Sequence, residues 1–430
     1  MRARLHWVSP LPPAETDIAH YTRRILPALL EHVDVVLWST EPWDPEIERL
    51  APVRHLDADA HMPFDLSGLP PRPASSEMVV YQIGNSWLFH AGILKVARRV
   101  PGCVVLHDLG LQDLAWMMLE NGLIDHGAYR AAMAAWYGRE GREASERILA
   151  KQLSPAEAAT RFPLFEIALP RATAVLIHTD TAFKAVTARK FVPAYQTELP
   201  FAPSPAASAA RASEGPLKLV QFGYMAPNRR LDSVLEALAG LDLAFELGLY
   251  GQFRDEDRVR TKIARLGLSD KVRFNGFVAE EVLDDALRQA HLAFNLRHPT
   301  MGEASGSQLR IWNAAAAAAV TDQGWYGALP DEVAFKIPVQ GEREALQALL
   351  RRLDAERGLS EQVGAAGRAR LEALHTPERY ASAIAEIAAN AERDTREALL
   401  SARARALLQG RRRPALLTRQ LAAVIGGDQP

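Results

Sequence analysis

The chain has 430 residues, of which 48% are hydrophobic and 24% charged, and its formal net charge is -2. This near-neutral balance argues against general nucleic-acid binding, and no apolar run approaches the roughly 20 residues of a membrane span. The single cysteine, Cys103, excludes an internal disulfide and a cysteine-based zinc site. The length suits two domains, and the chain starts in a strand pattern without an apolar leader, so we expect a cytoplasmic globular protein.

Short apolar runs alternate with longer amphipathic segments in the first half, which is typical of parallel βαβ units. The predicted strands cover residues 4–8, 35–38, 53–56, 78–83, 102–106 and 174–178. A mostly helical insertion, 109–169, separates the last two and is rich in Met, Ala, Trp and Tyr. It either overhangs a cleft at the carboxyl ends of the strands, as a ligand-binding surface, or uses its aromatic residues only to pack against the domain.

A small-residue, proline-containing linker at 201–216 ends the first domain, predicted as 1–200. The second alternation predicts a domain at 217–385, and then a C-terminal helix and basic tail at 386–430. The predicted strands of the second domain cover residues 217–222, 245–250, 272–274, 292–296, 318–321 and 333–337. The predicted fold class is therefore α/β, with two Rossmann-like, doubly wound parallel sheets and substrates between them.

Residues 296–331 are the most informative stretch. An apolar strand is followed by a Gly/Ser loop with one carboxylate, a helix near 307–316, and a short buried strand that ends near 322. A loop of small residues that opens a helix leaves backbone N–H groups free, and these favour an anion such as a diphosphate. Glu303, at the mouth of the loop, can accept hydrogen bonds from sugar hydroxyls. The combination indicates a nucleotide-sugar site.

The same residues resemble the donor-site signature of family 4 retaining glycosyltransferases, in particular a mannosyltransferase-like subset. This subset carries Arg-x-Pro-Thr-x-Gly-Glu-x-Ser before the helix and Ser-Asp-x-Gly-Trp after it. Further segments resemble the family in the same order: 9–13 with 18–21, 81–85 with His90, 105–108, and 222–229. The resemblance covers roughly residues 4–390. It implies the GT-B fold, in which two domains face each other across a cleft and the last helix crosses back to the first domain.

The resemblance also implies a donor site in the second domain. The residues assigned to it are Gly223, Arg229, Arg230, Gly302, Glu303, Ala304, Ser305, Gly306 and Ser307. Arg229 lies where the family usually has a basic residue against the diphosphate, and Arg230 could share this role. The alternative is a solvated arginine pair, although cations are slightly unfavourable at a helix start.

Glu303 corresponds to the first carboxylate of the family's Glu-x7-Glu pair, which contacts the donor sugar. The alternative is that Glu303 caps the following helix. The second carboxylate, which binds the ribose in the family, is absent, because Ile311 occupies its position. We therefore expect the ribose contact to come from elsewhere, with Arg310 or Gln308 as guesses.

The acceptor or sugar contacts are predicted in the first domain. His107 and Asp108 directly follow strand 102–106, and side chains at the carboxyl edge of a parallel strand point into the cleft. The family places this histidine near the reacting sugar, so His107 joins Arg229 and Glu303 as a catalytic candidate. Asn85, His90 and His178 are weaker candidates, for which a structural role is the alternative.

Asp17 is a second departure from the family, which commonly has a glycine there to let the backbone approach the diphosphate. A carboxylate at a place meant for an anion should repel it. Either this loop does not touch the diphosphate, or Asp17 binds a hydroxyl of the acceptor or sugar. The metal-binding motif Asp57-x-Asp59 has no supporting context, so we expect neither a metal nor another cofactor.

The sequence thus predicts a retaining glycosyltransferase with a GDP-mannose-like or UDP-sugar donor and a glycan, lipid-linked saccharide or small glycoside as acceptor. The basic C-terminal tail could hold it on an anionic membrane. The main alternative is a noncatalytic nucleotide-sugar or glycan-binding protein with a degenerate site. A third alternative is a sugar-phosphate synthase or phosphorylase, whose additional pocket the sequence does not locate.

Overall fold

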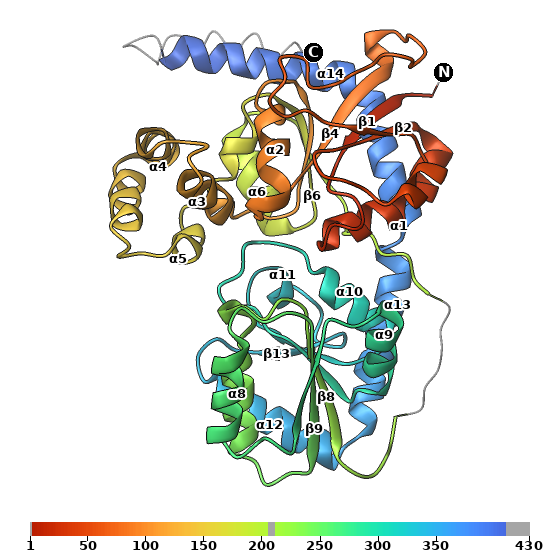
Figure 1. Cartoon of the computed structure of the whole chain (residues 1–430), viewed down its shortest axis with the longest axis vertical. Coiled ribbons are helices and arrows are strands. Elements are labelled where there is room, and N and C mark those ends of the chain that lie inside the picture. The colour runs from red at the N-terminus through yellow and green to blue at the C-terminus, as the bar shows by residue number, and fades with distance from the viewer. Residues whose placement is uncertain (1, 205–210, 410–430) are drawn as a thin grey trace, which may run out of the picture.

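The computed structural model describes residues 2–204 and 211–409, which form two α/β domains, one above the other in Figure 1. The first sheet has seven strands in the order β3-β2-β1-β4-β5-β6-β7, and the second has six in the order β10-β9-β8-β11-β12-β13. Neighbouring strands within each sheet pair in parallel. The predicted fold class is therefore confirmed.

The strands of the first sheet are β1 (Arg4–Val8), β2 (Asp34–Ser39), β3 (Val53–His55), β4 (Glu77–Ile83), β5 (Gly102–Leu106), β6 (Ala172–Ile177) and β7 (Ala194–Gln196). The strands of the second are β8 (Leu217–Phe222), β9 (Phe245–Tyr250), β10 (Val272–Gly276), β11 (Leu292–Asn295), β12 (Ala318–Thr321) and β13 (Phe335–Ile337). The edge strand β7 was not predicted.

The helices of the first domain are α1 (Asp17–His32), α2 (Trp87–Ala97), α3 (Gln112–Glu120), α4 (His126–Leu149), α5 (Pro155–Ala159) and α6 (Asp180–Arg189). The second domain has α7 (Leu231–Ala239), α8 (Glu256–Arg265), α9 (Glu280–Gln289), α10 (Gly306–Asn313), α11 (Gly324–Gly327), α12 (Glu342–Ala355) and α13 (Gly358–Leu374), and α14 (Pro377–Gln409) follows. Short 3₁₀ turns are η1 (Pro45–Arg49), η2 (Ala74–Ser76), η3 (Phe165–Ala168) and η4 (Pro227–Arg229).

Both faces of the first sheet are buried, which explains why its strands read as continuous apolar runs. In β5, Cys103 and Val105 belong to one core, while Val104 and Leu106 belong to the core on the opposite face. Successive side chains of a strand point to opposite faces, so each face needs its own helical cover. Cys103 is fully buried, and its burial raises the pKa of the thiol to about 12, as befits a structural cysteine.

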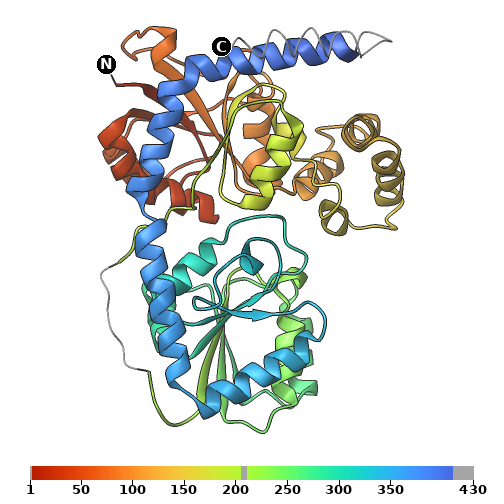
Figure 2. The ribbon, with the colours of Figure 1, turned by 180° about the vertical axis from the view of Figure 1, so that it is seen from behind.

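The long helix α14 leaves the second domain and packs on the first, against α1 and β6 (Figure 2). It begins at Pro377, directly after Thr376, where the long Ala/Glu/Arg pattern of the sequence starts, and Tyr380 is already buried in the core of the first domain. The ring of Tyr380 lies 5.5 Å from that of Tyr21 in α1 and 6.0 Å from that of His178. The chain therefore returns to the first domain within the first turn of α14.

The two chain segments that connect the domains are bonded to each other. The amide of Phe201, on the outgoing segment, donates to the carbonyl of His375 at 2.6 Å. In return, Nδ1 of His375 lies 2.8 Å from the carbonyl oxygen of Leu199. Leu199 and His375 are both buried, so these two hydrogen bonds fix the place at which the chain crosses between the domains.

The insertion forms an arm of helices α3 to α5 at the side of the first domain (Figure 1). The Trp136 ring packs 5.0 Å from Phe191, which follows α6, and so ties the arm to the rest of the first domain. Within the insertion, the Tyr137 ring lies 5.3 Å from Phe162. The Tyr137 hydroxyl also donates to the buried carboxylate of Glu166 at 2.7 Å. Packing thus accounts for Trp136 and Tyr137.

None of the helices within 2–204 and 211–409 is long and apolar enough to cross a membrane. In the same ranges, no group of three or more His, Cys, Asp and Glu side chains is placed to hold a metal ion. Of the C-terminal helix and basic tail predicted at 386–430, residues 410–430 lie outside the described residues.

Candidate functional site

The carboxyl edges of the two sheets meet at the junction of the domains, and two hydrogen bonds join them there. The amide of Gly110 donates to the carbonyl of Met301 at 2.8 Å, and the hydroxyl of Thr179 donates to the carbonyl of Gly302 at 3.1 Å. Gly302 has a φ of +75°, and a β-carbon there would stand 2.7 Å from Cβ of Leu109. Only glycine allows this approach, which brings the loop after β11 against the first domain.

Glu303 is held within this loop by its own neighbours. Its Oε2 accepts hydrogen bonds from the Thr300 hydroxyl and the Met301 amide, both at 2.7 Å. Its Oε1 lies 3.4 Å from Nε of Arg297. Glu303 does not cap α10, because Ser305 does so by accepting from the amide of Gln308 at 3.1 Å. Of the two alternatives for Glu303, the cap is therefore wrong.

Arg229 lies beside the start of α10. Its Nη1 is 3.5 Å from the hydroxyl of Ser307, and its Nη2 would be 2.8 Å from a β-carbon at Gly223. Gly223, with a φ of +100°, thus makes room for the guanidinium. Burial, followed by the charge of Arg297, lowers the pKa of Arg229 to about 9, so the side chain remains a cation at neutral pH.

Arg230 serves a different purpose from its neighbour. Its Nε and Nη2 donate to the carboxylate of Glu342 in α12, at distances down to 2.6 Å. Because Glu342 is buried, this ion pair fixes the start of α7 on α12. The structure thus corrects the prediction for Arg230: its guanidinium is engaged by Glu342, so that of the two arginines only Arg229 stays a candidate for the diphosphate.

Asp108 faces the loop from the first domain. Its Oδ2 accepts from the amide of Asn85 at 2.7 Å. Burial and then the nearby charge of Glu303 raise the pKa of Asp108 to about 7, while the charge of Arg297 acts in the opposite direction. The carboxylate of Glu303, from the other domain, therefore lies close enough to disfavour the ionisation of Asp108.

Asn85 is less available than the sequence suggested. Its Nδ2 donates to Asp113 and its Oδ1 accepts from the amide of Leu114, both at 3.1 Å. The side chain fixes the start of α3 and has both ends engaged. The prediction of a sugar contact for the Asn85 side chain is corrected accordingly.

The three candidate histidines of the first domain differ in access to solvent. His107 is partly exposed, and its Nε2 lies 2.7 Å from Oε1 of Gln82. His90 and His178 are almost fully buried and bond to the carbonyls of Gln82 and Thr197. Burial lowers the pKa of His90 and of His178 to about 4 and that of His107 well below its usual value. His107 can meet a ligand as a neutral imidazole, whereas His90 and His178 are structural, contrary to the prediction.

Asp17 does approach the anion-favouring helix end. Its Oδ2 would lie 3.4 Å from a β-carbon at Gly306, the first residue of α10. The charge of Asp17 also raises the pKa of Arg229. The first loop is therefore next to the predicted diphosphate position.

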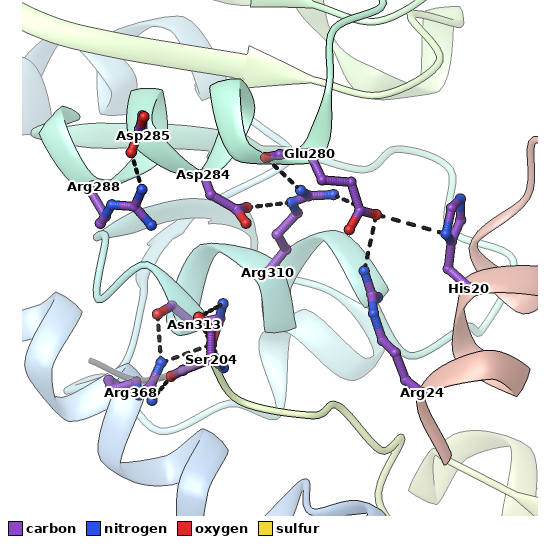
Figure 3. A network of polar contacts seen from close by, with 10 residues as sticks. All are labelled: His20, Arg24, Ser204, Glu280, Asp284, Asp285, Arg288, Arg310, Asn313 and Arg368. Atoms are coloured by element: carbon purple, nitrogen blue, oxygen red, sulfur yellow. Dashed lines mark hydrogen bonds and ion pairs between the residues drawn. The ribbon is translucent and has the colours of Figure 1, made fainter. Parts of the chain in front are cut away.

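A charged network joins the domains beside this position (Figure 3). Oε1 of Glu280 in α9 lies 3.2 Å from Nη2 of Arg24 and 3.7 Å from Nδ1 of His20, both in α1. The same oxygen is 3.5 Å from Nη1 of Arg310, whose Nε donates to Asp284 at 2.7 Å. Arg310 is thus committed to α9 and does not supply the ribose contact guessed from the sequence.

The other two positions considered for the ribose contact, Gln308 and Ile311, lie in the interior of the second domain. Ile311 and Gln308 are fully buried, and Oε1 of Gln308 accepts from Asn295 at 3.0 Å. Gln308 is therefore also an unsuitable ribose ligand.

Two residues of the site were missed by sequence reasoning. Arg297 lies between Glu303 and Arg229, and Gln82 orients His107. Arg297 follows β11 after a single residue, so the rule that led to His107 could also have found it. Gln82 lies inside β4, and no sequence signal distinguishes it.

Comparisons with known proteins agree with this geometry. Residues 229–386 match the family model described as "Glycosyl transferase-like". No curated protein sequence matches the chain. The solved structures that resemble it include sucrose-phosphate synthase from Thermosynechococcus elongatus (17% identity, TM-score 0.57, 90% of this chain and 98% of that chain). A second similar structure is Anabaena HepE in complex with UDP and glucose (14% identity, TM-score 0.58, 90% of this chain and 99% of that chain). A third is WaaG, a glycosyltransferase involved in lipopolysaccharide biosynthesis (15% identity, TM-score 0.54, 89% of this chain and 99% of that chain).

The protein thus has the GT-B fold of glycosyltransferases, over nearly its whole length. Its second domain, which carries Arg229 and Glu303, is glycosyl transferase-like in sequence as well.

Proposed function

We propose that this protein is a retaining glycosyltransferase of family 4, which moves a sugar from a nucleoside-diphosphate donor to a saccharide or lipid-linked acceptor. The proposal depends chiefly on one observation: Arg229, Ser307 and the start of α10 lie together, with Glu303 in the preceding loop and Asp108 opposite. A cation and free helix-end amides suit a diphosphate, and a half-buried carboxylate beside them suits the hydroxyls of the attached sugar.

The reaction breaks the bond between the anomeric carbon of the sugar and the diphosphate oxygen. Arg229 and the amides at the start of α10 stabilise the charge that grows on the leaving diphosphate. The acceptor hydroxyl attacks the anomeric carbon from the same face, and the leaving phosphate oxygen takes its proton. Glu303 orients the sugar, while His107, as a neutral imidazole, hydrogen-bonds a hydroxyl of the sugar or acceptor. The configuration at the anomeric carbon is retained.

A UDP-sugar is the first donor to test, because the similar structure of HepE holds UDP and glucose. A GDP-sugar such as GDP-mannose is the second, on the strength of the motif around Glu303. The donor would act without a metal ion or other cofactor. The acceptor is a growing glycan, a lipid-linked saccharide or a small glycoside, reached from the cytoplasm. The basic residues at 411–419 would hold the enzyme at the membrane.

The proposal can be tested with a thermal-shift screen over UDP- and GDP-sugars, followed by assays of nucleoside diphosphate release. A donor that binds only the folded protein raises its melting temperature. We expect release of the diphosphate with the stabilising donor and its loss, by at least about tenfold, in Glu303→Gln. Glu344→Gln, which changes an exposed carboxylate of α12, is the matched control. Stabilisation by a nucleotide sugar without release under any acceptor would instead support the noncatalytic binding protein.

A further inference from the structure

Arg297 is a charged residue at the centre of the junction to which the sequence assigned no role. Its backbone is fixed on both sides: its amide donates to the Thr321 hydroxyl at 2.9 Å, and its carbonyl accepts from the Gln323 side chain. The side chain is 12% exposed. A long cation thus extends from a rigid position at the carboxyl edge of the second sheet.

Arg297 and Arg229 come from neighbouring strands. Arg297 follows β11 and Arg229 lies in the turn after β8, and these two strands pair in parallel. The charge of Arg297 lowers the pKa of Arg229, second only to the effect of burial. The two guanidinium groups are therefore close enough to repel each other in a partly desolvated place.

The carboxylates of the junction leave donor groups of Arg297 free. Its Nε faces Glu303 at 3.4 Å, but Glu303 also accepts hydrogen bonds from Thr300 and Met301. Among the described residues, the terminal nitrogens of Arg297 have no hydrogen-bond partner, and neither is sealed from solvent. Arg229 likewise has only the 3.5 Å contact from Nη1 to Ser307. Two adjacent guanidiniums with unused N–H groups facing water are ready to bind an anion.

We propose that Arg297 is a second donor-binding arginine, which grips the diphosphate together with Arg229. The inference rests on the proposed function and adds a residue to it. A guanidinium presents a planar fork that matches two phosphate oxygens, and a diphosphate has enough oxygens for two forks. An anion between the two arginines also relieves their mutual repulsion, so its binding is favoured twice.

The test is calorimetric titration of wild type, Arg297→Gln, Arg297→Lys and Arg229→Gln with UDP and, separately, with GDP. Neither nucleotide carries the transferred sugar on its diphosphate, so a residue that contacts only that sugar does not change their binding. For the nucleotide that wild type binds more tightly, we expect Arg297→Gln to weaken binding roughly ten- to hundredfold, as for a lost charge-assisted contact. Arg297→Lys keeps the charge without the fork, and we expect an intermediate loss. Arg258→Gln, which changes an exposed arginine paired with Asp232, is the control.

Unchanged nucleotide binding in folded Arg297→Gln, together with weaker binding of the matching nucleotide sugar, would overturn the proposal. Arg297 would then act only by holding Glu303 for the sugar. If Arg297→Gln does not fold, Arg297→Lys decides the matter, because full affinity in that variant argues against a bidentate phosphate contact. Failure of wild type to bind any nucleoside diphosphate or nucleotide sugar would count against the proposed function itself, so the two failures are distinguishable.

Discussion

The carboxylate of Asp17, in the first domain, lies against Gly306, the first residue of α10 in the second domain. Oδ2 of Asp17 would be 3.4 Å from a β-carbon at Gly306. The free amides and the dipole at a helix start attract negative charge. Asp17 therefore occupies the neighbourhood that we assign to the donor diphosphate, and the two anions compete for the same electrostatic environment.

We predict that Asp17→Asn strengthens the binding of UDP or GDP by roughly two- to tenfold, the size expected for a charge next to a helix end. The gain should shrink as salt is added, because screening weakens the repulsion. Calorimetric titration at low and high ionic strength measures both effects. Glu31→Gln, at an exposed position of α1, serves as the control. Weaker binding in Asp17→Asn would mean that Asp17 accepts a hydroxyl of the ligand instead.

A second prediction concerns the stability of the protein as a function of pH. Burial and Glu303 raise the pKa of Asp108 to about 7 in the folded state, above the 3.8 of an ordinary aspartate. Folded protein then holds a proton that the unfolded chain releases, so this contribution is fully present below pH 3.8 and is lost as the pH rises through 7. Asp108→Asn should therefore stabilise the protein relative to wild type at pH 8, on the order of 1–2 kcal/mol, since Asp108 keeps some access to water.

Denaturant titrations of wild type and Asp108→Asn at pH 5 and pH 8 provide the measurement. The advantage of the variant should be larger at pH 8. An equal difference at both pH values would show that Asp108 does not titrate in this range.

A third prediction concerns the charged network of Figure 3. Glu280→Gln removes the partner of Arg24 and His20 and so weakens the link between α1 and α9. Exposed ion pairs contribute only about 0–1 kcal/mol, so the melting temperature should change little. The domains should nevertheless open more often, because this link spans them.

Fluorescence transfer between dyes on the two domains would detect such opening. Cys103 is fully buried and its thiol is hard to ionise, so Leu50→Cys and Glu344→Cys can be labelled selectively. Lower transfer efficiency in the Glu280→Gln background is the expected result. An unchanged efficiency, with Glu281→Gln as the matched control, would show that the network does not hold the domains.

A fourth prediction concerns α14. Tyr380 is fully buried between Tyr21 and His178, so Tyr380→Ala leaves a cavity in the first domain. We expect a loss of about 3–5 kcal/mol in the free energy of unfolding, as for other large aromatic residues cut to alanine. Leu399→Ala, at a position of the same helix that is 61% exposed, should change it by less than about 0.5 kcal/mol. Equal effects of the two substitutions would contradict the packing of α14 on the first domain.

Most of the fold could be predicted from the sequence because its parallel strands are buried on both faces and read as apolar runs. Strand β7 was missed because it has three residues, Ala194–Gln196, and pairs only with β6. Such a short edge strand carries little pattern of its own. The returning helix and its start after Thr376 were predicted, whereas the packing of Tyr380 on Tyr21 and His178 is a long-range contact that the sequence does not show.

The site was predictable in outline and not in its details. The rule that side chains after parallel strands gather at one edge correctly placed His107 and Asp108 at the junction. It could not show that Glu342 engages Arg230, or that Asp113 engages Asn85, because those partners lie far away in the sequence. The rule could have placed Arg297 at this edge as well, but not its nearness to Glu303, Arg229 and Asp108, which come from three different segments.

The two contacts of His375, one through its carbonyl to Phe201 and one through its imidazole to Leu199, have a mechanical consequence. Because both connections between the domains cross at one place, the two domains can rotate relative to each other about a single hinge line. Rotation about that line moves residues near it very little and residues at the far edge the most. A ligand bound between the two domains would then be detected as a change in the angle between them.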